Sequence, residues 1–271
     1  MVPLMGNVDD EDTLRVAMDL ATTMQACVRG LQIAELPIPA YNAWSILPDY
    51  DMSEVYDQIR HAAQSMAAKW RTKFSHHGVS ITIDVVDALY VSPWSAVVHE
   101  APCADLIVVA SHDRGNDDAS GFHRNLVPLL LRSGRPLLVI PRHAALTEHL
   151  SRAVVAWKNV RESIRALHDA LPLLKHVETI DVVTVDAPED MHIEMEALLG
   201  HLSAHGIQAS WVARRSNGTP VAEILMVHAT HVQAGVLVAG GYGHSRLHEW
   251  VLGGVTRELL EHAELPLFLS H

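Results

Sequence analysis

The sequence predicts an α/β protein built from two doubly wound domains, each a parallel sheet with helices on both faces. Three observations support this fold class. Short apolar runs alternate with amphipathic helical patterns about five times in each half of the chain. Apolar residues make up 49% of the chain and aromatic residues only 5%, which suits aliphatic strands buried between helices. In addition, segments of the two halves match each other at one constant spacing.

That spacing indicates an internal duplication. Asp105–Ser111 (DLIVVAS) aligns with Gly235–Gly241 (GVLVAGG), and Arg135–Leu138 (RPLL) aligns with Leu265–Phe268 (LPLF). Both matches have the same offset of 130 residues and need no gap. Two duplicated domains are therefore favoured over one large domain. We expect the first domain at residues 1–143 and the second at 150–271.

The elements of the first half follow from periodicity and turn residues. The last strand of this half has a proline on each side, at 136 and 141, which predicts a position at the edge of a sheet. The first strand is short, and a start upstream of Met1 would lengthen it. We expect strands near residues 2–5, 28–36, 79–85, 106–110 and 136–141, and helices near 12–21, 53–77 and 125–132, with a further short helix that starts at 92–93.

The second half repeats this order of elements. Its apolar runs are short and rich in valine and leucine, and each is followed by a helical pattern with polar residues on one side. We expect strands near residues 154–157, 180–185, 208–212, 235–239 and 265–269, and helices near 161–170, 189–205, 220–230 and 257–262.

A glycine-rich loop lies between the expected strand at 235–239 and the helix at 257–262. Its glycines Gly240, Gly243 and Gly253 have the spacing Gly-x2-Gly-x9-Gly. Glycines between a strand and a helix let backbone amides approach an anion, and the helix N-terminus adds partial positive charge. The spacing differs from that of the dinucleotide fingerprint and of the P-loop, whose lysine is absent. A phosphate cradle and a turn without a ligand both remain possible.

The first half lacks the glycines of this loop. Acidic residues stand in the corresponding segment instead, at Asp113, Asp117 and Asp118, and they would repel a phosphate. We therefore expect the first half to bind no phosphate and to serve as a structural partner of the second. The residues in the places of Gly240, Gly243, Gly253 and Gly254 are Ala110, Asp113, His123 and Arg124.

With the tandem halves, this loop and the closing segment HAELPLFLSH, the chain resembles the tandem universal stress proteins, which have two UspA-like domains. The resemblance implies Rossmann-like domains of the adenine nucleotide alpha hydrolase-like type, each with a five-stranded parallel sheet of order 3-2-1-4-5. It implies either an adenine-nucleotide site or none. It also implies an intrachain pseudo-dimer through the last strands of the two halves, and it leaves a homodimer of whole chains open.

The resemblance also assigns site residues and shows two departures from the family pattern. The usual serine or threonine after the last loop glycine is replaced by Gly254, although Thr256 offers a hydroxyl nearby. The aspartate that usually ends the first strand is replaced by Trp157 in the second half and by Met5 in the first. The indole of Trp157 would either stack on a base or fill the pocket. The expected nucleotide site comprises Ala156, Trp157, Asn159, Gly240, Gly243, His244, Gly253, Gly254, Val255 and Thr256.

Three functions are compatible with these residues. The first is a stress-response module that binds and senses ATP, with Mg²⁺, at one site in the second half. The second is a scaffold, or a module for another small ligand, with a closed or altered pocket. The third is a slow ATP hydrolase, which would need a water-positioning group and a magnesium carboxylate that the sequence does not identify. No catalytic residue is predicted.

Composition and motifs exclude other classes. A net charge of −12 argues against nucleic acid and against an anionic membrane surface as partners. No apolar run is long enough to span a bilayer, and no signal peptide is recognisable, so a cytoplasmic location is expected. Cys27 and Cys103 have no metal or redox spacing. The histidine pairs 201/205 and 244/248 lack a third ligand at a recognisable spacing, so no metal site is predicted.

Overall fold

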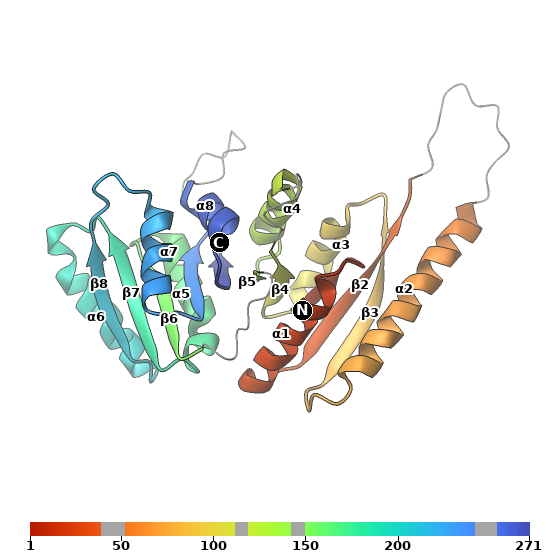
Figure 1. Ribbon diagram of the computed structural model, residues 1–271, viewed down its shortest axis with the longest axis horizontal. Helices are drawn as coiled ribbons and strands as arrows, with labels where there is room; N and C mark the ends of the chain where they lie inside the picture. The colour runs from red at the N-terminus through yellow and green to blue at the C-terminus, as the bar shows by residue number, and fades with distance from the viewer. Residues whose placement is uncertain (39–51, 112–118, 142–149, 242–253) are drawn as a thin grey trace, which may run out of the picture.

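The structure, a computed structural model, describes residues 1–38, 52–111, 119–141, 150–241 and 254–271, and for residues 119–124 it describes the backbone alone. The chain forms two α/β halves that lie side by side, with β1–β5 in the first half and β6–β10 in the second (Figure 1). Strands and helices alternate along each half, as the apolar pattern predicts.

In the first half, the long strands β2 and β3 lie against the long helix α2 (Figure 1). The strands are β1 (Val2–Leu4), β2 (Val28–Leu36), β3 (Ile81–Leu89), β4 (Ile107–Ala110) and β5 (Leu137–Ile140). The helices are α1 (Asp10–Met24), α2 (Met52–Phe74), α3 (Pro93–Glu100), the 3-10 turn η1 (Ala101–Cys103) and α4 (Ala119–Arg132).

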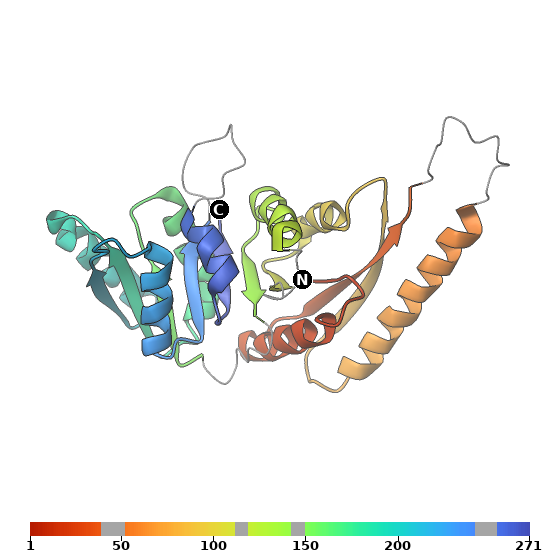
Figure 2. The same ribbon diagram turned by 45° about the horizontal axis from the view of Figure 1, so that its top comes forward.

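In the second half, helices cover both faces of the sheet (Figures 1 and 2). The strands are β6 (Arg152–Ala156), β7 (Thr179–Val185), β8 (Ala209–Arg214), β9 (Val236–Gly240) and β10 (Leu267–Ser270). The helices are α5 (Arg161–Leu174), the 3-10 turn η3 (Glu189–Met191), α6 (His192–Ala204), α7 (Val221–His231) and α8 (Gly254–His262).

The strands form one sheet of three and one of seven, so the expected count of five strands in each sheet is wrong. The orders are β1-β2-β3 and β4-β5-β10-β9-β6-β7-β8. The five strands of the first half are distributed over both sheets, because β1 has only three residues and pairs too briefly with β4 to join the sheets. Its contact with β4 consists of two hydrogen bonds, from the Met1 nitrogen to the Leu106 carbonyl (2.7 Å) and from the Val108 amide to the Met1 carbonyl (2.9 Å). With β4 thus beside β1, the first half has the expected order 3-2-1-4-5.

The seven-stranded sheet crosses from one half to the other through β5 and β10. These strands pair antiparallel, with Phe268 opposite Leu138. Because β5 also pairs with β4, the expected edge position of β5 is wrong. Pro136 and Pro141 lie just outside the four-residue strand, so no ladder amide is lost. The Pro136 carbonyl even accepts a hydrogen bond from the Ile107 amide (3.0 Å).

The register of the strands confirms the internal duplication. In the first half Ile107 lies opposite Leu137, and in the second half Leu237 lies opposite Leu267. Each member of the second pair follows its counterpart by the 130 residues read from the sequence. The fourth and fifth strands of each half are therefore paired in the same register, so the two halves share structure as well as sequence pattern.

The core lies in two layers on either side of the sheet of the second half. Successive residues of β6 alternate between them, since Val155 belongs to the layer under α5 and α6 and Val154 to the layer under α7. Within the described ranges, no helix combines the length and apolar character needed to cross a membrane.

Candidate functional site

The candidate site lies at the carboxyl ends of β6 and β9. These strands are neighbours, and the chain leaves β6 for β7 on one side while β9 lies on the other, which makes this a topological switch point. The ladder brings Val155 opposite Val238, so Ala156 and Gly240 end their strands next to each other. Ligands of open α/β sheets bind at this position.

The structure places the described part of the predicted site at this end of the sheet. Asn159 is exposed in the connection from β6 to α5. Gly254 and Val255 are exposed in the first turn of α8, whereas Thr256 is buried there. The remaining predicted residues, Gly243, His244 and Gly253, lie outside the described residues.

Trp157 is part of the core. Its side chain is 8% exposed and belongs to the same buried cluster as Met191 and Met195. The indole nitrogen donates to Glu194 Oε1 of α6 at 3.4 Å, and the backbone amide donates to the Val183 carbonyl at 2.8 Å. These contacts argue against the stacking of the indole on a base, because the ring would have to leave the core.

Gly240, at the end of β9, is required by packing against a backbone. A Cβ on Gly240 would lie 2.6 Å from the Glu162 carbonyl carbon and 2.7 Å from the Ser163 nitrogen, both in the first turn of α5. A Cβ on Gly241 would lie 2.6 Å from Leu130 Cδ2 of α4. Close approach of another backbone is a recognised reason for glycine, so Gly240 needs no ligand to explain it, whereas Gly241 meets only the end of a leucine side chain.

Basic side chains flank the start of α5. Lys158 and Arg161 are exposed there, and Glu162 is the acidic residue of the first turn. Val160 takes the N-cap position with an apolar side chain, which cannot accept a hydrogen bond from the first helical amides. This helix N-terminus therefore combines amides that have no N-cap side chain with two cations. The basic pair, Lys158 and Arg161, was not predicted from the sequence. Its positive charge contrasts with the negative charge of the segment 9–12 at the start of α1, and this contrast was the available signal.

The equivalent position of the first half holds a carboxylate from the chain itself. Asp10 opens α1, is 4% exposed, and accepts hydrogen bonds from the Met5 amide (3.2 Å) and the Gly6 amide (2.7 Å). Burial raises the pKa of this carboxyl group to about 6, against the opposing effect of these amide bonds. The predicted acidic residues Asp113, Asp117 and Asp118 lie outside the described residues. Asp10 supplies a separate reason why this end of the first half disfavours phosphate.

The rings of three histidines on α5 and at the end of α6 lie in contact with one another. The His201 and His205 ring centroids are 4.7 Å apart, and His168 of α5 lies 5.2 Å from His201. Among the residues that the structure describes, no three His, Cys, Asp or Glu side chains are arranged to hold a metal ion. The pair His244 and His248 lies outside those residues.

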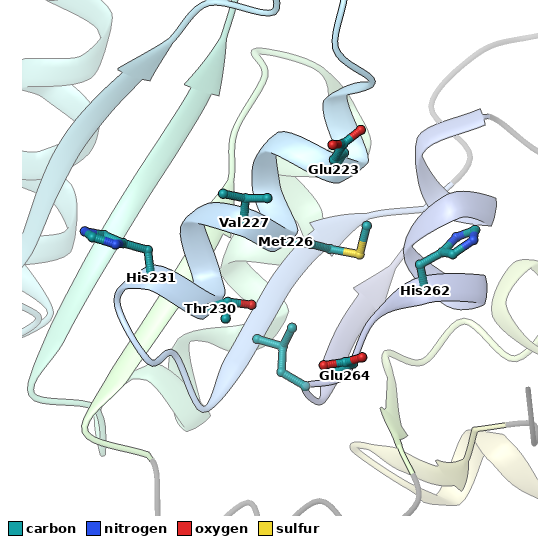
Figure 3. Close-up of a pocket in the computed structure, with 8 residues that line it drawn as sticks. Glu223, Met226, Val227, Thr230, His231, His262 and Glu264 are labelled. Carbon is teal, nitrogen blue, oxygen red and sulfur yellow. The ribbon is translucent and has the colours of Figure 1, made fainter.

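Two grooves run along α7. The first, of about 430 Å³, separates α7 from the end of α8, and Figure 3 shows its lining side chains. The second, of about 410 Å³, lies between α7 and β8. The first is lined by Glu223, Met226, Val227, Thr230, His231, His262, Glu264 and Leu265, and the second by Arg214, Thr219, Glu223, Ile224, Val227, His228 and His231.

Comparison with solved structures identifies the fold. A universal stress protein from Archaeoglobus fulgidus DSM 4304 has a similar structure, with a TM-score of 0.78 and 13% identity. The similarity covers 100% of this chain and 97% of the length of that protein. A candidate universal stress protein from Pseudomonas aeruginosa UCBPP-PA14 is similar over 91% and 94%, with a TM-score of 0.57 and 15% identity. No family model and no curated protein matches the sequence. The chain has the fold of a tandem universal stress protein.

The same fold also occurs in another context. The cytoplasmic domain of a prokaryotic cation chloride cotransporter is similar over 99% of this chain and 93% of its own, with a TM-score of 0.53 and 12% identity. The fold alone therefore does not determine the function, which depends on the residues of the site.

Proposed function

We propose that the chain is a stress-response regulatory module that binds one adenine nucleotide, ATP with Mg²⁺, at the β6–β9 switch point of the second half. The contrast between the two equivalent ends of the sheet carries this proposal. In the first half α1 begins with the acidic segment 9–12, and Asp10 takes two amides of the preceding loop. In the second half Lys158, in the connection before α5, and Arg161, the first residue of α5, lie beside amides that Val160 does not cap.

This arrangement fits the phosphate groups better than the base. Helix N-termini bind phosphate through their amides and their partial positive charge, and two cations add to the attraction. The N-termini of α5 and α8 both lie at this end of the sheet. Since Trp157 is held in the core, the adenine would lie over Ala156 and Asn159 rather than against the indole.

Titration calorimetry of the nucleotide-stripped protein with ATP and Mg²⁺ tests the proposal. We expect saturable binding that weakens at least about tenfold in Lys158→Gln/Arg161→Gln, since hydrogen bonds to charged groups contribute about 1.5–3 kcal/mol each. The matched control is Arg152→Gln/Lys175→Gln, which removes the same charge from exposed residues at the other ends of β6 and α5. Equal loss of affinity in both double variants would refute the assignment of the basic pair.

One observation favours a scaffold without a nucleotide. The base side of the switch point is closely packed, because Trp157 fills the space beside α6 and Gly240 lies against the backbone of α5. If this packing closes the site, the calorimeter will record no heat at millimolar ATP and the melting temperature will not change. That result would contradict the nucleotide proposal and leave the scaffold.

A further inference from the structure

A second polar cluster lies on the α7 face of β7 and β8 and is separate from the switch point. His228 of α7 is 5% exposed. Its Nε2 atom is 2.8 Å from Asp181 Oδ2 of β7, and its Nδ1 atom is 3.0 Å from Arg214 Nη2 of β8. Ser210 of β8 donates its hydroxyl to Asp181 Oδ1 at 2.9 Å. Three elements thus contribute to one connected chain of hydrogen bonds.

The chemistry of arginine fixes the protonation of this chain. A guanidinium group can only donate, so Nδ1 of His228 must accept the hydrogen bond from Arg214. The histidine proton then lies on Nε2 and is donated to Asp181. Both ring nitrogens are engaged, which leaves His228 no role as a base toward a substrate. The Asp181–His228 pair instead orients the guanidinium group of Arg214.

The guanidinium group of Arg214 has N–H donors left for a ligand. In the part of the chain that the structure describes, it makes no ion pair with a carboxylate, and its hydrogen bond to His228 uses one Nη2 hydrogen. Its side chain lines the groove of about 410 Å³ between α7 and β8. A positioned guanidinium fork in a groove is suited to bidentate recognition of an anion.

We propose that this groove binds a small carboxylate with an apolar body, the carboxylate on Arg214 and the hydrocarbon against Ile224 and Val227. The Val227 side chain is 62% exposed, so an apolar ligand would cover surface that is otherwise in contact with water. Glu223 also lines the groove and repels anions. Because phosphate carries more charge than a carboxylate, Glu223 disfavours phosphate more strongly.

An NMR titration of ¹⁵N-labelled protein with hexanoate tests the proposal, with hexanol as the uncharged analogue and inorganic phosphate as the other anion. We expect saturable shifts of the Arg214 Nε–H and Thr219 amide signals with hexanoate and not with hexanol. Arg214→Gln should weaken hexanoate binding at least about tenfold. Arg215→Gln, which removes the same charge from the next residue, should leave the affinity unchanged.

Two further variants complete the test. Glu223→Gln should tighten hexanoate binding several-fold, because a repulsive charge is removed. Lys158→Gln/Arg161→Gln should leave it unchanged, so the outcome is independent of the nucleotide proposal. Hexanoate binding that survives in Arg214→Gln, equal shifts with hexanol, or saturation by phosphate at lower concentration than by hexanoate would each overturn the inference.

Discussion

Replacement of Gly240 by alanine should destabilise the second half strongly. The added Cβ would lie 2.6, 2.7 and 2.9 Å from the carbonyl carbon of Glu162, the nitrogen of Ser163 and the carbonyl oxygen of Glu162, where ordinary contacts begin at 3.4 Å. All three are backbone atoms, so no side-chain rotation relieves the overlap and α5 must move. Overpacking of this kind costs about 1–3 kcal/mol. We expect Gly240→Ala near the upper end of that range.

Urea unfolding followed by far-UV circular dichroism measures this cost. The matched control is Gly200→Ala, inside α6, where an added Cβ has nothing within 4 Å. Alanine at that position should stabilise the chain by about 0.5–1 kcal/mol, because glycine is a poor helix former. A free energy of unfolding for Gly240→Ala within about 0.5 kcal/mol of the wild type would refute the packing explanation of this glycine.

Two further predictions concern the ends of the sheet. Burial raises the pKa of Asp10 to about 6 in the folded chain from an ordinary 3.8, so the neutral form stabilises the fold below about pH 4 and this stabilisation is lost as the pH rises through 6. Urea unfolding between pH 4 and 7 should show this fall in the free energy of unfolding in the wild type and a smaller fall in Asp10→Asn. Equal falls in the two proteins would contradict the raised pKa of Asp10. Trp157→Ala should cost about 3–5 kcal/mol, as expected for a buried indole, and a loss under 1 kcal/mol by the same assay would show that Trp157 is not a core residue.

Much of the fold could be predicted from the sequence because its signals are local. The sequence predicts a strand at 28–36, and β2 has these bounds; it ends directly before Pro37. The offset of 130 residues also holds in the strand register. The pairing of β5 with β10 does not follow from local signals, because it depends on contact between the halves; only the family resemblance implied a pairing through the last strands. The flanking prolines indicated an edge, although they lie just outside the strand.

The candidate site was only partly predictable. Glycine spacing identified Gly240, but the structure gives it a packing reason that spacing cannot reveal. The basic pair at 158 and 161 is local and could have been found from charge alone. The Asp181–His228–Arg214 chain could not, because His228 is 47 residues from Asp181 and 14 from Arg214 and no motif links them.

Equilibrium dialysis with labelled ATP and Mg²⁺ at saturation counts the nucleotide sites of the chain. We expect one ATP per chain, because the carboxylate of Asp10 takes the amides at the first-half end while the basic end of α5 is left for phosphate. Asp10→Asn should leave that stoichiometry at one, since the acidic residues at 9, 11 and 12 remain. Two ATP per chain, or none, would contradict a single nucleotide site in the second half.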